Sequence, residues 1–226
     1  MRFPLLLDPA PFRLDVGAIL HPTTIPLDDA VADSARTLVG QAESVARPRA
    51  FLRAARVDRL GDDGAVVVGG VRLVSHLLQR QLEGNAVVYP FLATCGRELD
   101  AWAAAIDPSD LLGRYFAEVI KEHAVQQAVA AALDRLQPAL DGQAVGIMNP
   151  GSLEDWPLTE QASLFRLFEG QDRELGVTLT ESSLMVPTKS VSGLAFASAT
   201  GFVPCQLCSR PDCPGRRAPY NPAEHP

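Results

Sequence analysis

Residues 149–196 read NPGSLEDWPLTEQASLFRLFEGQDRELGVTLTESSLMVPTKSVSGLAF, and this stretch decides the expected fold. A loop over 149–158 precedes a predicted helix at 159–168. Runs rich in β-branched and apolar residues then predict strands around 177–180 and 191–197. A loop, a helix and two strands in so short a stretch indicate a mixed fold.

The loop at the start of this stretch has the features of a ligand-binding loop. Glycine adds no side chain and tolerates a positive φ, so the backbone at Pro150-Gly151 can approach a ligand closely. Thr159 is expected to cap the next helix, whose amide groups would then favour a carboxylate in the loop. Glu181 and Ser182, at the end of a predicted strand, are expected to face the same cleft. An ordinary turn and a solvated edge carboxylate are the alternatives.

Outward from this stretch, helices and strands intermix without the regular alternation of a parallel sheet. The longest predicted helix covers 111–136, between a Pro-Ser-Asp start signal and Pro138. The other expected elements are a loop over 12–20, helices at 27–45, 75–82 and 97–106, a strand or a hairpin at 65–74, and strands at 86–94 and 144–148. We therefore expect an α+β fold, with a mixed, mostly antiparallel twisted sheet and flanking helices.

The motifs of residues 149–196 have the order and spacing of one known family. A Pro-Gly loop is followed eight residues later by Thr-Glu, and then by Leu-Thr-Glu-Ser, a Met, a Pro and a Ser-Val-Ser-Gly turn. In this sequence they are Pro150-Gly151, Thr159-Glu160, 179–182, Met185, Pro187 and 190–193. The stretch thereby resembles the activation domain of cobalamin-dependent methionine synthase, and the upstream pattern is compatible with the same fold.

The resemblance implies a function. In this family the domain binds S-adenosylmethionine and presents its methyl group to cobalamin that has become inactive cob(II)alamin. No cobalamin-, homocysteine- or folate-binding module fits in 226 residues, so the cobalamin is expected on a separate corrinoid protein. The chain would then be a methyltransferase-like reactivation component, in methionine synthesis or a related methyl transfer.

The resemblance also implies the residues of the S-adenosylmethionine site. They are Asn149, Pro150, Gly151, Ser152, Thr159, Glu160, Glu181 and Ser182. In the family, a carboxylate of the long helix holds the positive end of the ligand. Glu118 and Glu122 both lie near the matching place, one turn apart, and we take Glu118 as the candidate. An exposed helix glutamate without a ligand is the alternative for either.

Two positions depart from the family's pattern. Ile147 and Ser152 stand where the family has an Arg before the Pro-Gly and a Tyr after it. Loss of the Arg removes a charge-assisted contact with the ligand carboxylate, of order roughly 1.5 to 3 kcal/mol. Trp156 either stacks on a ligand ring in compensation or packs onto the core. These departures favour the rival hypothesis, a non-catalytic docking or assembly module for a corrinoid protein, with a structural metal.

Three of the four cysteines form a C-x2-C-x4-C array near the C-terminus, which is typical of metal ligands. The array is Cys205, Cys208 and Cys213, for which Cys95 is the best fourth ligand and His21, His76, His123 and His225 are poorer ones. Thiolates allow an iron-sulfur cluster or zinc, and free thiols without metal are the alternative. Because reduction of cob(II)alamin needs a low-potential electron, we favour the cluster. Arg210, Arg216 and Arg217 would stabilise a reduced cluster, meet acidic groups of a partner, or form a solvated basic tail.

Composition narrows the classes of partner. A net charge of −7 and a pI near 5.1 give no broad basic surface for nucleic acid. No apolar run reaches the roughly 18 to 20 residues of a membrane helix, so a cytoplasmic protein is expected. No motif of a hydrolase is present either. We divide the chain into an activation-domain-like domain, residues 1–200, and a cysteine-rich tail, residues 201–226.

Overall fold

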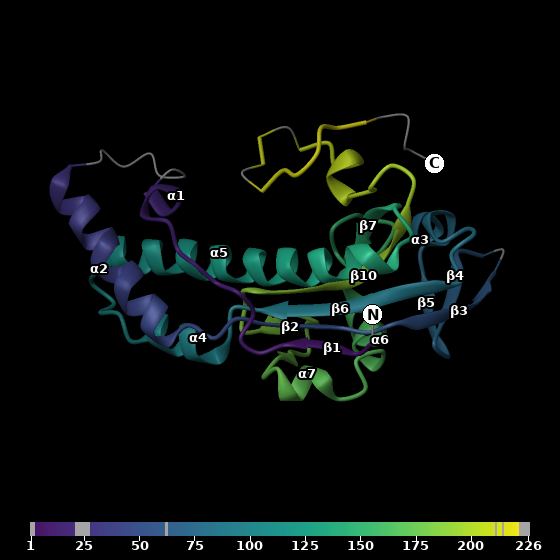
Figure 1. Cartoon of the computed structure of the whole chain (residues 1–226), viewed down its shortest axis with the longest axis horizontal. Coiled ribbons are helices and arrows are strands. Elements are labelled where there is room, and N and C mark those ends of the chain that lie inside the picture. The colour runs from purple at the N-terminus through teal and green to yellow at the C-terminus, as the bar shows by residue number, and fades with distance from the viewer. Residues whose placement is uncertain (1–2, 21–27, 62, 211, 214, 222–226) are drawn as a thin grey trace.

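The computed structural model describes residues 3–20, 28–61, 63–210, 212–213 and 215–221. As predicted, the fold is α+β, with an eight-stranded antiparallel sheet and helices that pack on both of its faces (Figure 1). A separate two-stranded ribbon is formed by β8 (Thr178–Leu179) and β9 (Met185–Val186).

The central strand of the sheet is β6 (Val87–Thr94), whose residues are buried after the first. Along one edge β6 pairs with β10 (Ser190–Ser198), and β10 pairs in turn with β7 (Ala144–Met148). Along the other edge, two strands pair with β6 one after the other, and three further strands extend the sheet from them. These five are β2 (Arg49–Leu52), β3 (Ala55–Leu60), β1 (Leu5–Leu7), β4 (Ala65–Val68) and β5 (Val71–Val74).

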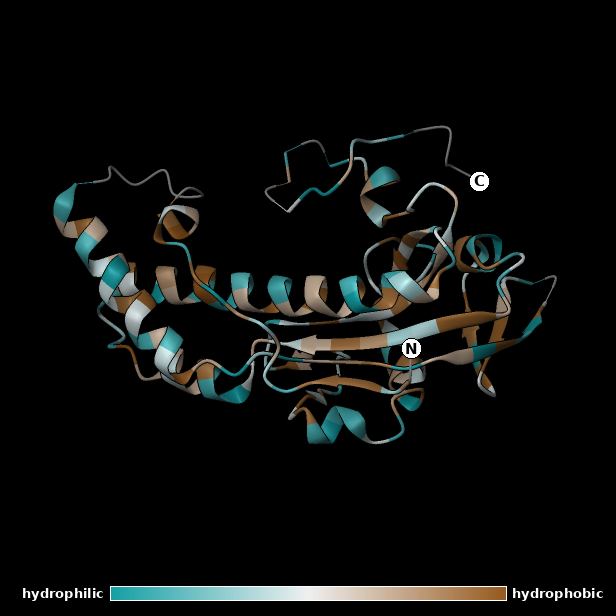
Figure 2. Cartoon of the chain, in the orientation of Figure 1, coloured by the Kyte–Doolittle hydropathy of each residue, from teal (hydrophilic) through white to brown (hydrophobic). Residues whose placement is uncertain are grey.

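Successive side chains of β6 point to opposite faces of the sheet, and the core is accordingly divided into two clusters. Tyr89, Phe91 and Ala93 face a helical layer, whereas Val88 and Leu92 face the opposite side. The helical layer contains α1 (Val16–Leu20), α2 (Asp29–Val45), α4 (Arg97–Ala104) and α5 (Leu111–Leu136). Figure 2 shows the apolar colouring along β6, in contrast to the polar residues along α2. The long α5 therefore lies against the sheet next to β10, where it forms one side of a pocket.

The second face is covered by shorter elements. They are α3 (His76–Gln81), the β4–β5 hairpin, α6 (Gln161–Arg166) and α7 (Gln171–Glu174). Trp156 and Phe202 are fully buried in this cluster. Short 3₁₀ helices follow α5 at Gln137–Ala139, precede α6 at Leu158–Glu160, and start the tail at Pro204–Gln206.

Local signals explain where the predicted elements begin. Asp110 caps α5 by accepting from the Gly113 amide at 2.8 Å, and Ser75 caps α3 by accepting from the Leu78 amide at 2.9 Å. The predicted strand at 144–148 and the predicted helix at 111–136 are confirmed to the residue. The predicted hairpin is also confirmed.

The predicted loop over 12–20 is partly wrong, because α1 begins there at Val16. Asp15 starts this helix by accepting from the amides of Gly17 and Ala18 at 3.3 and 3.2 Å. The strands β1, β2 and β3 were not predicted from the sequence. They are short: β1 (LLL) and β2 (RAFL) are apolar but too brief to indicate a strand, and β3 carries exposed charges.

Candidate functional site

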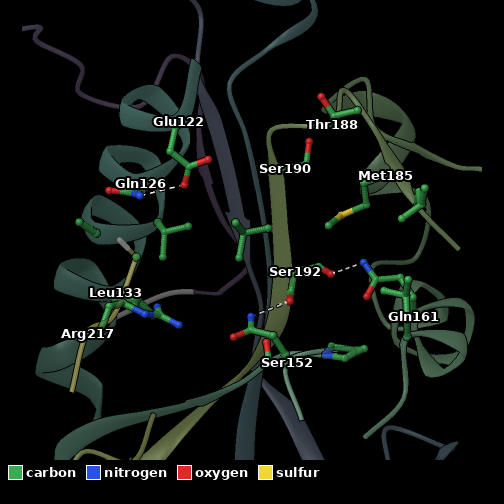
Figure 3. A pocket seen from close by; sticks show the side chains of 18 of the residues that line it. Glu122, Gln126, Leu133, Ser152, Gln161, Met185, Thr188, Ser190, Ser192 and Arg217 are labelled. Carbon is green, nitrogen blue, oxygen red and sulfur yellow. Dashed lines mark hydrogen bonds between the residues drawn. The ribbon is translucent and has the colours of Figure 1, made fainter. Parts of the chain in front are cut away.

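A pocket of about 960 Å³ lies between α5 and the edge of β10. Its walls come from four parts of the chain: α5, the loop after β7 with the start of α6, the segment from Ser183 through β10, and tail residues 215–217. Figure 3 shows α5 on one side of this space and β10 with the Met185 segment on the other. The size is in the range of small-molecule sites.

A buried hydrogen-bond network forms the floor of the pocket. The Asn149 side-chain amide donates to the Ser192 carbonyl at 2.8 Å, and the Gln161 amide donates to the Ser192 hydroxyl at 2.7 Å (Figure 3). All three residues are buried, where an unpaired polar group would be costly. The network therefore fixes the loop after β7, the start of α6 and β10 relative to one another.

Two glycines of the quoted stretch are required by backbone geometry. A Cβ on Gly193 would lie 2.4 Å from the Met148 carbonyl oxygen and 2.6 Å from the Asn149 amide nitrogen. Gly151 has a φ of +80°, which favours glycine, and its amide donates to the Trp156 carbonyl at 2.7 Å. These contacts explain why a Pro-Gly loop and a Ser-Val-Ser-Gly segment occur together: each shapes the floor of the pocket.

Glu122 is the carboxylate that α5 contributes to the pocket. It accepts from the Gln126 amide at 2.8 Å and pairs with the Lys189 ammonium at 3.0 Å. Burial opposes ionisation of Glu122, but these two donors outweigh it and hold the pKa of the carboxyl below its usual value. The pocket therefore contains a negative charge at neutral pH.

Glu118, the predicted site carboxylate, and Glu122 have different surroundings in the structure. Glu118 does not line the pocket; it pairs with Lys121 at 2.7 Å, and Lys121 also pairs with Asp100 of α4 at 3.0 Å. The sequence left Glu118 and Glu122 open because they lie one turn apart on the same side of a helix. Only the position of β10 beside α5 separates their surroundings.

Of the predicted loop residues, Asn149, Pro150 and Ser152 line the pocket, and Gly151 shapes the turn between them. Four other predicted residues do not line it. Thr159 is exposed within the 3₁₀ turn and caps no helix, because the turn begins after Pro157. The Glu160 carboxylate turns away and accepts from the Val74 amide of β5 at 2.9 Å. Glu181 and Ser182 are exposed in the β8–β9 turn, and the next three residues, Ser183, Leu184 and Met185, line the pocket instead.

Ile147, which replaces the family's Arg, and Trp156, the candidate for a compensating contact, both belong to the core. Trp156 is fully buried among the apolar side chains of the second cluster, so it packs rather than stacks on a ligand. Ile147 is 4% exposed in β7 and belongs to the first cluster. Neither residue lines the pocket.

The structure does not assemble the predicted metal site. Among the described residues, which include all four cysteines, no group of three or more His, Cys, Asp or Glu side chains is placed to hold a metal ion. Cys95 is fully buried at the end of β6, where burial raises the pKa of its thiol to about 12. Of the poorer candidates, His123 lines the pocket, and His21 and His225 lie outside the described residues. A metal site at the cysteine array therefore stays a prediction.

The tail that contains the array has a position the sequence did not predict: it covers part of the pocket. Arg216 fastens it by donating to the carbonyls of Cys205, Cys208 and Ala218 at 2.9–3.0 Å, and also to that of Arg210. Beside it, burial opposes ionisation of the Cys205 thiol, yet hydrogen bonds from Arg217 outweigh this and lower its pKa. No sequence signal links residues 215–217 to α5, because the contact is long-range.

Comparisons with known proteins agree with this architecture. Residues 151–202 match the family model described as vitamin B12 dependent methionine synthase, activation domain. Among solved structures, the fold is similar to a crystal structure of the MetH reactivation domain bound to AdoHcy (S-adenosylhomocysteine). The TM-score is 0.57 at 21% identity, covering 80% of this chain and 69% of that one. The comparison with curated proteins finds no match.

The structural comparison defines the class of fold: this chain has an activation-domain-like fold. It resembles, in particular, the activation domain of vitamin B12-dependent methionine synthase, in sequence over 151–202 and in fold over most of its length. In the described part of the chain, no helix combines the length and apolar character needed to cross a membrane.

Proposed function

We propose that this protein binds S-adenosylmethionine in the pocket between α5 and β10 and reactivates a cobalamin cofactor held by a separate corrinoid protein. The single observation that carries the proposal is the pocket itself, because most of its floor lies within the segment that matches the activation-domain model, residues 151–202. The structural neighbour, which binds AdoHcy, supports the same ligand class. Methionine synthesis or a related methyl transfer would be the context.

The lining of the pocket suits the parts of this ligand. Glu122 offers a negative charge for the positive sulfonium and ammonium groups. Leu133, Met185 and Val191 offer apolar surface for the adenine ring. Asn149 and Ser192 add polar groups whose positions are fixed by their mutual hydrogen bond. A few fixed polar groups within an apolar lining are what orient a small molecule in a pocket.

In the proposed reaction, this chain acts by positioning its substrates. Transfer of a methyl cation breaks the bond between sulfur and the methyl carbon and leaves S-adenosylhomocysteine. One electron must also reach the cobalt of the partner from a low-potential donor. No side chain of the pocket is required as a nucleophile, so the contribution is proximity and orientation.

The rim of the pocket supports access by a large partner. Leu158 and Leu184 line the pocket and are 36% and 53% exposed. Val186 of β9, next along the chain, is also exposed. Exposed apolar side chains around a pocket mark contact sites more often than isolated ones do. We assign this rim to the contact with the corrinoid-bearing domain.

Transfer of a labelled methyl group tests the proposal. The chain is mixed with S-adenosylmethionine labelled on the methyl group, a chemical one-electron reductant, and the cob(II)alamin-loaded part of a methionine synthase that lacks its own activation domain. We expect label in methylcobalamin only when this chain is present, and inhibition by S-adenosylhomocysteine. Binding of S-adenosylmethionine without any transfer would instead support the rival hypothesis.

That rival is a docking or assembly module without methyl transfer. One observation favours it: Ile147, in place of the family's arginine, is buried in the core, so β7 supplies no cation to a ligand carboxylate. A metal site in the tail stays a prediction under either hypothesis, and metal analysis of protein purified without oxygen would test it.

A further inference from the structure

A cation in the pocket would bind a ligand carboxylate more strongly than neutral donors do, and β7 does not provide one. Lys189 lies nearby, but its ammonium is paired with Glu122 at 3.0 Å. Among the described residues that line the pocket, the permanently charged cations are the guanidinium groups of Arg216 and Arg217, both from the tail. The source of a carboxylate-binding group is therefore the segment that covers the pocket.

The two arginines have different tasks. The Arg216 guanidinium is occupied by the tail's own backbone, donating to four carbonyl oxygens between residues 205 and 218. It holds the tail in shape. Arg217 follows directly, so the turn that Arg216 fixes also determines where the Arg217 side chain begins.

Arg217 extends from this turn into the pocket. Figure 3 shows its guanidinium beside Leu133 of α5, on the side of the pocket where Ser152 lies and away from Glu122. The Arg217 guanidinium and the Glu122 carboxylate therefore lie in different parts of the pocket. The Arg217 side chain donates to the Cys205 thiol, and a guanidinium has five donors, so this contact leaves donors for a ligand.

We propose that Arg217 is the carboxylate-binding residue of this pocket, contributed by the C-terminal tail in place of a residue on the sheet. The inference rests on the proposed function, because it takes the ligand to be a nucleoside with an amino-acid end. It makes the tail part of the ligand site, with Arg216 as the positioning residue that holds Arg217. A guanidinium can bind a carboxylate through two parallel hydrogen bonds, which a lysine cannot do.

The test compares S-adenosylmethionine with its decarboxylated analogue by calorimetric titration into the full chain. The unchanged protein should bind S-adenosylmethionine about ten- to hundred-fold more tightly than the analogue. Arg217→Gln should remove this difference and leave the affinity for the analogue unchanged. Arg217→Lys should restore only part of it. Arg210→Gln is the matched control, because Arg210 is an exposed tail arginine that does not line the pocket.

The outcomes separate the inference from the proposed function. Full discrimination retained in Arg217→Gln, with normal binding, would overturn the role of Arg217 and leave the proposed function standing. Equal loss of both ligands in a variant with an unchanged near-ultraviolet circular dichroism spectrum would also overturn it, since the carboxylate would not be the group recognised. Failure of the unchanged chain to bind either ligand would overturn both proposals.

Discussion

The floor and the cover of the pocket are held in place by different means. The floor is buried, and Gly193, Asn149 and Ser192 leave no room for an alternative arrangement of β7 and β10. The cover, within residues 204–221, is partly exposed and depends on the hydrogen bonds of one arginine. The family match, residues 151–202, includes Gln161, Ser192 and Gly193 of the floor but not Asn149, and it ends before the cover. The resemblance in sequence thus extends to most of the floor and not to the cover.

The largest effect is expected for Gly193→Ala in the floor. The added methyl group would meet the Met148 carbonyl oxygen at 2.4 Å, so the free energy of unfolding should fall by at least about 3 kcal/mol in urea denaturation. Gly40→Ala is the control, because Gly40 lies within α2 with nothing near its Cβ position; it should stabilise the protein by about 0.5 to 1 kcal/mol. A Gly193→Ala variant as stable as the unchanged chain would contradict the role of the floor.

The next effect separates Glu122, which lines the pocket, from Glu118, which lies one turn earlier on α5 and does not. Glu122→Gln should weaken binding of S-adenosylmethionine about tenfold, and that of S-adenosylhomocysteine less, because only the former carries a sulfonium. Titration of both ligands measures the ratio of the two affinities. Glu118→Gln is matched in chemistry but lies outside the pocket, so its ratio should equal that of the unchanged chain. The reverse pattern would restore Glu118 as the site residue.

The cover should loosen without unfolding of the domain when its arginine is removed. Arg216→Gln loses hydrogen bonds to the Cys205, Cys208 and Ala218 carbonyls. Amide hydrogen exchange should become faster at the described tail residues, while the global free energy of unfolding changes by about 1 kcal/mol or less. Exchange unchanged in the tail would mean that Arg216 does not hold the cover.

The smallest effect concerns an ion pair that belongs to neither region. Hydrogen bonds from Arg49, at 2.6 and 2.9 Å, hold the pKa of Glu98 below its usual value. Its folded pKa lies below the unfolded one, so this stabilisation is present above the unfolded pKa and is lost as the pH falls through the folded pKa. Glu98→Gln should flatten the acid limb of a stability-against-pH curve, by less than about 1 kcal/mol because the pair is partly exposed. An unchanged curve would show that the Arg49–Glu98 pair does not contribute to the pH dependence of stability.

The sequence predicted the floor far better than the cover, for physical reasons. Local signals mark the floor: apolar strands, the cap of α5 at Asp110, and a glycine where the backbone turns at Gly151. The cover depends on a contact between residue 217 and a helix more than eighty positions away, which leaves no local pattern. For the same reason the cysteine array predicted a metal site, although spacing alone does not bring Cys95 to the tail.

The most direct test of the central claim is calorimetric titration of S-adenosylmethionine into the protein, purified without oxygen, with S-adenosylhomocysteine as a competitor. Our account predicts saturable one-to-one binding at micromolar concentrations, and competition between the two ligands for one site. Absence of heat and of any thermal shift up to millimolar ligand would contradict it, and the pocket between α5 and β10 would then not be a site for this nucleoside.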